Sequence, residues 1–269
     1  MRAALRENFP VTPTQSFARS SLPSISQLRA ADTWGRRTGD FICGPLAFYA
    51  LLASERQTLH DLKKFLRLHF PDFLRSSKKA PRAAGLTLDE GLVRLKETYS
   101  KALAGYRVVN LNRRPGQKDL LQGVSRTLDR AATLRKPILL QIGAYCGSVE
   151  NGNNRWSRTL GHFVTLTGMG ARPGKRDPMR ELQYWDPWDG SVHSGVLYEE
   201  VFRDFTALKP PAFTNGFRSG HRTSPNGHRV LSPYLCLLAP HMDLYSNQVY
   251  FAQRYLYAIE RALIPAGGK

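Results

Sequence analysis

The spacing of apolar residues predicts helices in the first half of the chain. The segment that follows Cys43-Gly44-Pro45 is apolar on every side, which is typical of a buried helix. Pro45 suits the first helical turn, because the N–H that proline lacks has no helical partner there. Thr58 to His69 has an amphipathic period and predicts a second helix.

Two further helices are predicted before residue 135. Thr87-Leu88-Asp89-Glu90 has the pattern of a capping box, and apolar residues continue at helical spacing as far as Leu103. Another helix is predicted from Lys118 to Leu134.

The pattern then changes to short apolar runs and alternation, which predict strands. The predicted strands are Pro137–Ile142, Gly161–Gly168, Leu182–Trp185 and Val230–Leu238. A short helix is predicted from Tyr198 to Phe205, a long loop over 209–229, and a last amphipathic helix from Ser246 to Ile264. This order indicates an α+β fold, with N-terminal helices packed against an antiparallel β-sheet.

Length and composition indicate one large domain with an appendage. The chain has 269 residues, of which 42% are hydrophobic and 22% charged, as in ordinary globular proteins. Residues 1–35 are rich in Ser, Thr and Pro, and predict an extended or disordered leader that wraps on the domain. The alternative for this leader is a targeting or export segment. Residues 36–269 are expected to form a catalytic domain with a C-terminal helix.

The charge balance bears on the partners. Lys and Arg number 39 against 21 for Asp and Glu, a formal net charge of +18. Such a surface attracts acidic proteins and anionic surfaces, although an arginine-rich soluble protein is the plainer interpretation. No nucleic-acid-binding motif accompanies the charge, so no specific nucleic acid is expected.

Cysteine usage and hydropathy bear on the compartment. The three cysteines, Cys43, Cys146 and Cys236, form no close pairs and have no zinc-ligand spacing. We therefore expect no disulfide framework, no metal, no cofactor and a reducing compartment. No transmembrane stretch or secretory signal peptide is recognised, so the expected location is the cytoplasm or, after non-classical export, outside it.

Three residues in different predicted elements have the types needed for nucleophilic catalysis. Cys43 begins a helix, where unpaired N–H groups and the helix dipole favour a thiolate, and Gly44 is expected to leave room for substrate. His162 begins a strand, and Asp186 ends the next one. Neighbouring strands lie about 4.8 Å apart, so the Asp186 carboxylate is expected to reach the imidazole.

Together these residues predict a Cys43 nucleophile, a His162 base and an Asp186 that orients the base. Asp189 is the second choice for the acid. Each residue also has a plainer interpretation, as a core cysteine, a satisfied histidine or a turn aspartate.

The other cysteines and the tryptophans near the site have less specific interpretations. Cys146 is interpreted as structural or incidental, and Cys236 as a core residue. Trp156, Trp185 and Trp188 lie close in sequence to His162 and Asp186, and are interpreted either as core or as the lining of a substrate cleft.

Three motifs give the chain a resemblance to a known family. Gly39–Pro45 with its apolar helix, Gly161–Val164 and Tyr184–Gly190 resemble motifs of papain-like cysteine peptidases. The resemblance is strongest to the leader peptidases of bacteriocin exporters, the double-glycine peptidases, and their stand-alone relatives. It covers residues 35–205, and it implies a papain-like fold and hydrolysis of an amide bond.

One position departs from the family pattern. The family carries a Gln about six residues before the cysteine, whose amide helps to form the oxyanion hole, and this chain has Arg37 there. Loss of one such donor typically costs about 10²–10³ in rate. Arg36, Arg37, Gln27 and a backbone N–H are the candidate replacements, and a catalytically silent relative is the alternative.

Three functional hypotheses follow. The first is a cysteine hydrolase that cleaves a peptide or isopeptide bond of a protein, with an effector or toxin role; deamidation and acyl transfer of the transglutaminase type would share its acyl-enzyme. The second is a catalytically silent binding module on a papain-like scaffold. The third, least favoured, is a basic nucleic-acid-binding protein in which the three motifs are coincidental.

Overall fold

The structure is a computed structural model of the 269-residue chain. It describes residues 15–16, 26, 42–74, 85–111, 120–150, 153–170, 180–202, 232–239 and 254–266.

The described helices lie before residue 135, where the sequence predicts them. They are α3 (Cys43–Ser54), α4 (Leu62–His69), α5 (Pro71–Leu74), α6 (Leu88–Lys96), α7 (Ser100–Leu103) and α8 (Leu120–Thr133). The predicted capping box forms in part, since the Thr87 hydroxyl accepts the Glu90 N–H at 3.2 Å. None of the helices in this described part of the chain is long and apolar enough to cross a membrane.

The strands cover more of the chain than the sequence predicts. They are β1 (Gln15–Ser16), β2 (Tyr106–Asn110), β3 (Ile138–Glu150), β4 (Asn153–Met169), β5 (Arg180–Asp186), β6 (Ser191–Phe202), β7 (Ser232–Leu238) and β8 (Arg254–Pro265). The predicted strands at 137–142, 161–168, 182–185 and 230–238 correspond to β3, β4, β5 and β7.

Six of the described strands close into an antiparallel barrel. Their order is β4-β3-β8-β7-β6-β5, and β5 pairs again with β4 to complete the ring. Outside the barrel, β2 pairs with β8, and the two-residue β1 pairs with the end of β4. The predicted papain-like α+β fold, with N-terminal helices against an antiparallel sheet, is therefore wrong, because the strands form a closed barrel and the helices are few.

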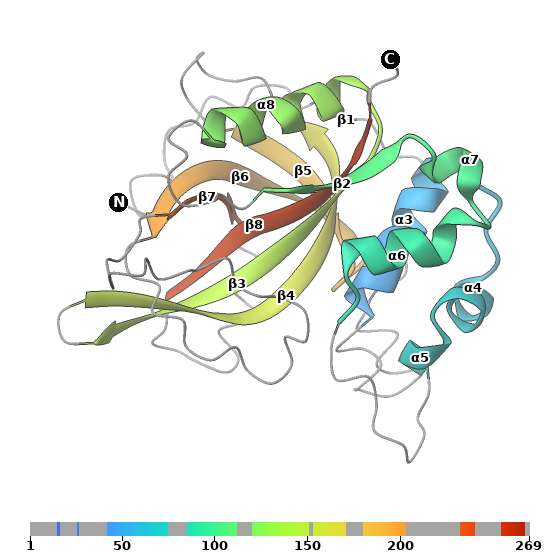
Figure 1. Cartoon of the computed structure of the whole chain (residues 1–269), viewed down its shortest axis with the longest axis horizontal. Coiled ribbons are helices and arrows are strands. Elements are labelled where there is room, and N and C mark those ends of the chain that lie inside the picture. The colour runs from blue at the N-terminus through green and yellow to red at the C-terminus, as the bar shows by residue number, and fades with distance from the viewer. Residues whose placement is uncertain are drawn as a thin grey trace, which may run out of the picture.

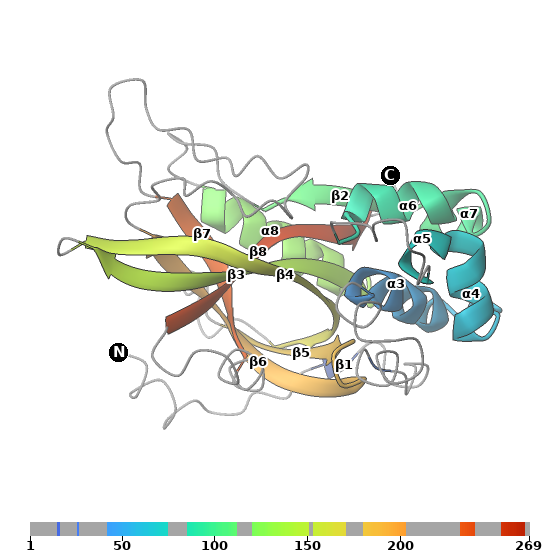
Figure 2. The same ribbon diagram turned by 90° about the horizontal axis from the view of Figure 1, so that it is seen from below.

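The barrel wall separates two hydrophobic cores. The inner core takes residues from all six barrel strands, and α8 adds Leu128 and Ala131 to it. The outer core gathers the helices α3 to α7 on one side of the barrel, as Figures 1 and 2 show. Helix α3 is apolar all round because it lies between the barrel and the other helices.

The predicted C-terminal helix at Ser246–Ile264 is wrong over its described part, because Arg254–Pro265 forms β8; residues 246–253 lie outside the described residues. A bulge explains the misleading pattern. In the pairing of β3 with β8, Gln141 faces Arg261 and Ile142 faces Ile259, so one residue of β8 is skipped. Ile259 and Ala262 both reach the inner core, at a spacing that imitates a helix.

The predicted helix at Tyr198–Phe205 is also wrong as far as the structure describes it. Residues up to Phe202 continue β6, which pairs with β7 from Val196 to Phe202. The polar pair Glu199 and Glu200 breaks the alternation that would have indicated a strand.

Two described parts of the predicted leader belong to the fold. Gln15 and Ser16 pair with Met169 and Gly168 at the end of β4, and Ser26 is buried. The rest of residues 1–35 and the predicted loop at 209–229 lie outside the described residues.

Gly91 allows α6 to lie close to α3, which yields a prediction about stability. A Cβ at this position would lie 2.1 Å from Cε2 of the buried Phe48 ring. We expect Gly91→Ala to lower the free energy of unfolding by about 1–3 kcal/mol through overpacking. This loss exceeds the stability gained from the higher helix propensity of alanine. Gly85→Ala is the matched control, since nothing lies within 4 Å of a Cβ there. Urea denaturation checks both, and equal stabilities would contradict the packing of α6 on α3.

Candidate functional site

His162 and Asp186 meet where β4 and β5 stop pairing. The last pair at this end of the two strands is Thr165 with Trp185. His162 and Asp186 lie just beyond that pair. His162 Nε2 lies 2.7 Å from Asp186 Oδ1. Barrel closure therefore brings a base and a carboxylate from separate strands into contact.

His162 lies inside a strand, although the sequence predicts it at a strand start. Strand β4 begins at Asn153, and its first part forms a long hairpin with β3, in which His162 is opposite Ile142. The hairpin extends past the rest of the barrel (Figures 1 and 2). The outermost pair of this hairpin is Glu150 with Asn153, and residues 151–152 lie outside the described residues.

The Asp186 carboxylate is buried and held in place by the turn that follows it. Oδ1 accepts a hydrogen bond from the Trp188 N–H at 2.8 Å in addition to the contact with His162. The Asp186 carbonyl accepts the Gly190 N–H at 2.9 Å, and Gly190 has a φ of 74°, which favours glycine. Because a carboxylate only accepts, this contact requires the proton of His162 on Nε2.

The Cys43 side chain lies close enough to His162 to help raise the pKa of the imidazole. Since Nε2 is engaged by Asp186, Nδ1 is the nitrogen left to exchange a proton with the Cys43 sulfur. Burial lowers the pKa of His162, but the charge and hydrogen bond of Asp186, followed by those of Cys43, outweigh it and raise the pKa to about 10. The arrangement favours an imidazolium beside Cys43 at neutral pH.

Cys43 is the first residue of α3 and is only 6% exposed. No side chain caps this helix end at Ile42, and the first intrahelical bond runs from the Leu46 N–H to the Ile42 carbonyl. The N–H groups of Cys43 and Gly44 therefore have no acceptor within the helix. They lie at the positive end of its dipole, where negative charge is stabilised.

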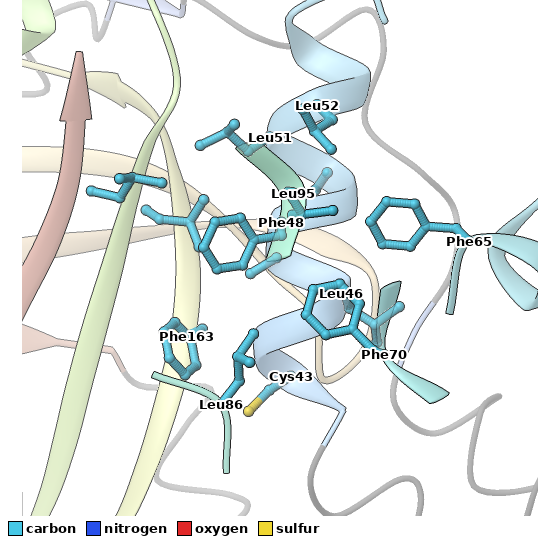
Figure 3. Close-up of a cluster of buried hydrophobic side chains, with 14 of the residues drawn as sticks. Cys43, Leu46, Phe48, Leu51, Leu52, Phe65, Phe70, Leu86, Leu95 and Phe163 are labelled. Atoms are coloured by element: carbon cyan, nitrogen blue, oxygen red, sulfur yellow. The ribbon is translucent and has the colours of Figure 1, made fainter. Parts of the chain in front are cut away.

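Gly44 has a different role from the one that the sequence suggests. A Cβ at Gly44 would lie 2.8 Å from the Leu86 Cβ and 3.4 Å from a ring carbon of Phe163. Leu86, Phe163 and Cys43 lie close together at the start of α3 (Figure 3). The expectation that Gly44 leaves room for substrate is therefore wrong, because its small size lets α3 pack closely against Leu86 and β4.

Asp189, the second choice for the acid, contacts Ser191 and His193. Its Oδ1 accepts the Ser191 N–H at 2.9 Å, and its Oδ2 lies 2.8 Å from His193 Nε2. Asp186 is thus the carboxylate that contacts His162. Sequence reasoning missed His193, although the spacing of Asp189 and His193 across a turn was the available signal.

The structure also places several of the other residues that the sequence singles out. Cys236 and Trp185 are core residues, at 0% and 1% exposure, and Trp188 is partly exposed. The side chains of Cys146 and Trp156 lie outside the described part, as do Arg36, Arg37 and Gln27. No group of three or more His, Cys, Asp or Glu side chains that could hold a metal ion occurs among the residues that the structure describes.

Comparison with protein-family models, curated proteins and solved structures finds no match to this chain. The site is therefore interpreted from its own geometry.

The raised pKa of His162 gives a testable prediction. Its imidazole should keep both protons at pH 8 and titrate near pH 10, whereas a free histidine titrates near about 6.5. Asp186→Asn should lower this midpoint, because it removes the charge that favours the imidazolium. Histidine-selective NMR over pH 5–11 measures both, with His162→Gln to assign the signal. A wild-type midpoint near that of free histidine would contradict the site.

Because the protonation of His162 is linked to folding, the pH dependence of stability gives a second test of the His162–Asp186 pair. Because the folded pKa lies above the unfolded value, the contribution of His162 is fully present below about pH 6.5 and is lost as the pH rises through about 10. The stability advantage of the wild type over His162→Gln should therefore shrink between these pH values. Urea denaturation at pH 6, 8 and 10 measures it, and a constant difference would argue against the charged pair.

Proposed function

We propose that this protein is a cysteine hydrolase that cleaves a peptide or isopeptide bond through a Cys43-His162-Asp186 triad. The observation that carries the proposal is the 2.7 Å contact between Asp186 Oδ1 and His162 Nε2, with Cys43 near enough to His162 to raise the pKa of its imidazole. The three side chains come from β5, β4 and the start of α3, so sequence proximity does not explain their meeting. The sequence resemblance supplies the reaction class as an expectation.

In the first half of the reaction, an acyl-enzyme forms. The Cys43 proton resides on His162 Nδ1, and the thiolate attacks the carbonyl carbon of the amide. The C–N bond then breaks, and His162 gives its proton to the departing amine. A thioester between Cys43 and the acyl group remains.

In the second half, water cleaves the thioester. His162 takes a proton from the water as the oxygen attacks the acyl carbon, and the C–S bond breaks. The acid leaves, and the Cys43 thiolate and His162 imidazolium are restored. Asp186 keeps Nε2 protonated and the ring oriented throughout, without itself taking the proton.

The start of α3 supports stabilisation of the oxyanion. The N–H groups of Cys43 and Gly44 have no acceptor within the helix, and they belong to the proposed nucleophile and to the residue that follows it. Donors aimed at a developing oxyanion are a large term in acyl transfer. The second donor expected near Arg37 lies outside the described residues, so the backbone carries this part of the proposal.

The test uses a peptide library, because no substrate needs to be known in advance. Purified wild type and Cys43→Ala are incubated with peptides from a digested proteome in water enriched in oxygen-18. Mass spectrometry then finds new carboxyl termini that carry the label. We expect cleavage by the wild type and none by Cys43→Ala, with His162→Ala reduced by about 10²–10⁴-fold and Asp186→Ala reduced less.

The same experiment separates the competing functions. Equal cleavage by wild type and Cys43→Ala would contradict the proposal. Products in which glutamine becomes glutamate would indicate deamidation, and products joined to an added amine would indicate acyl transfer. A wild type that leaves every peptide unchanged would favour a silent binding module.

A further inference from the structure

A second histidine–carboxylate pair holds the turn that follows the proposed catalytic acid. Asp189 accepts two hydrogen-bond contacts, from the Ser191 N–H at 2.9 Å and from His193 Nε2 at 2.8 Å. Both side chains are partly exposed, at 30% for Asp189 and 22% for His193. An exposed pair of this kind contributes little stability by itself, about 0–1 kcal/mol, so its position matters more than its strength.

The pair acts on the same four-residue turn that provides the Trp188 N–H to Asp186. Strands β5 and β6 pair at Asp186 with Ser191, and the turn between them begins and ends at these two residues. Asp189 lies within the turn and bonds forward to β6, through Ser191 and His193. These contacts fix the turn to the strand from its far side.

His193 is itself anchored to the barrel. It is paired with Tyr184 across β5 and β6, and the two ring centroids are 6.1 Å apart. Tyr184 is fully buried in the inner core. The contacts therefore run from the core through Tyr184 and His193 to Asp189, and from there to the turn.

The turn in its observed position puts two donors on one oxygen. Asp186 Oδ1 receives the Trp188 N–H at 2.8 Å and faces His162 Nε2 at 2.7 Å. If the turn shifts, the Trp188 N–H moves with it, and Asp186 Oδ1 loses the hydrogen bond that helps to hold it against His162. The orientation of His162, the proposed base, thus depends on the contacts of Asp189 with Ser191 and His193, which hold the turn.

We propose that Asp189 and His193 are positioning residues, which hold the turn so that Asp186 Oδ1 stays on His162 Nε2. This inference rests on the proposed function for its importance to catalysis. Its structural content, a coupling between His193 and His162 through Asp189, Trp188 and Asp186, is testable without any substrate.

The experiment compares three substitutions of His193 by histidine-selective NMR. His193→Ala removes the donor. His193→Gln and His193→Asn are a matched pair, because the Gln amide nitrogen can take the place of Nε2 and the shorter Asn amide cannot reach Asp189. The measured quantity is the titration midpoint of His162, and thermal unfolding shows that each variant is folded.

We expect His193→Ala and His193→Asn to lower the His162 midpoint by about one pH unit, a tenfold change in the protonation equilibrium. His193→Gln should keep the wild-type midpoint. Asp61→Asn is the control, because Asp61 accepts the Lys64 N–H in a similar contact at the remote helix α4. It should leave the His162 midpoint unchanged.

An unchanged midpoint in folded His193→Ala, or equal midpoints in His193→Gln and His193→Asn, would overturn the inference. An equal shift in Asp61→Asn would also overturn it, because the effect would not be specific to the turn. Failure of the proposed function has a different signature, namely peptide cleavage that persists in Cys43→Ala.

Discussion

Closure of the barrel between β4 and β5 is the constraint on which the candidate site depends. The pairing of these strands runs from Met169 with Leu182 to Thr165 with Trp185 and then stops. Just past this point, His162 and Asp186 are near enough for a contact of 2.7 Å. The carboxylate is buried, and an unpaired charge there would be costly, so the imidazolium and the Trp188 N–H together satisfy it. The site is therefore part of the structure that closes the barrel.

The nucleophile is placed by packing against the outside of the same wall. Helix α3 fits closely because Gly44 has no side chain where Leu86 and Phe163 lie. Phe163 is next to His162 in the chain, so the residue that seats the helix and the residue that contacts Cys43 belong to one strand. Any shift of α3 on the wall would change the distance between the sulfur and the imidazole. Fold and proposed chemistry thus depend on the same contacts.

The sequence predicted the local elements and the candidate residues better than the architecture. The helix at Cys43 and the strands around His162 and Asp186 follow from local apolar patterns, and the structure contains them. The barrel did not follow, because its closure is a pairing between strands that no local pattern reveals. In β8, the bulge next to Ile259 changed the period of two into a spacing that resembled a helix.

In the candidate site, too, the residue types were predicted from the sequence, whereas their contacts required the structure. The types and order of Cys43, His162 and Asp186 predicted a triad, and the structure brings the three side chains together. The choice between Asp186 and Asp189 needed the turn geometry, in which the backbone N–H of Trp188 selects the first and His193 engages the second. The role of Gly44 needed the position of Leu86, which is distant in sequence.

The pairing of Cys43 with His162 can be tested through the rate at which iodoacetamide alkylates Cys43 as a function of pH. Mass spectrometry identifies the modified cysteine, and the buried Cys236 is the internal reference. A Cys43 thiolate paired with the His162 imidazolium should be alkylated fast well below pH 8, and His162→Ala should show an ordinary thiol profile. Slow alkylation of Cys43 in the wild type, with the same profile in His162→Ala, would contradict an activated thiolate–imidazolium pair.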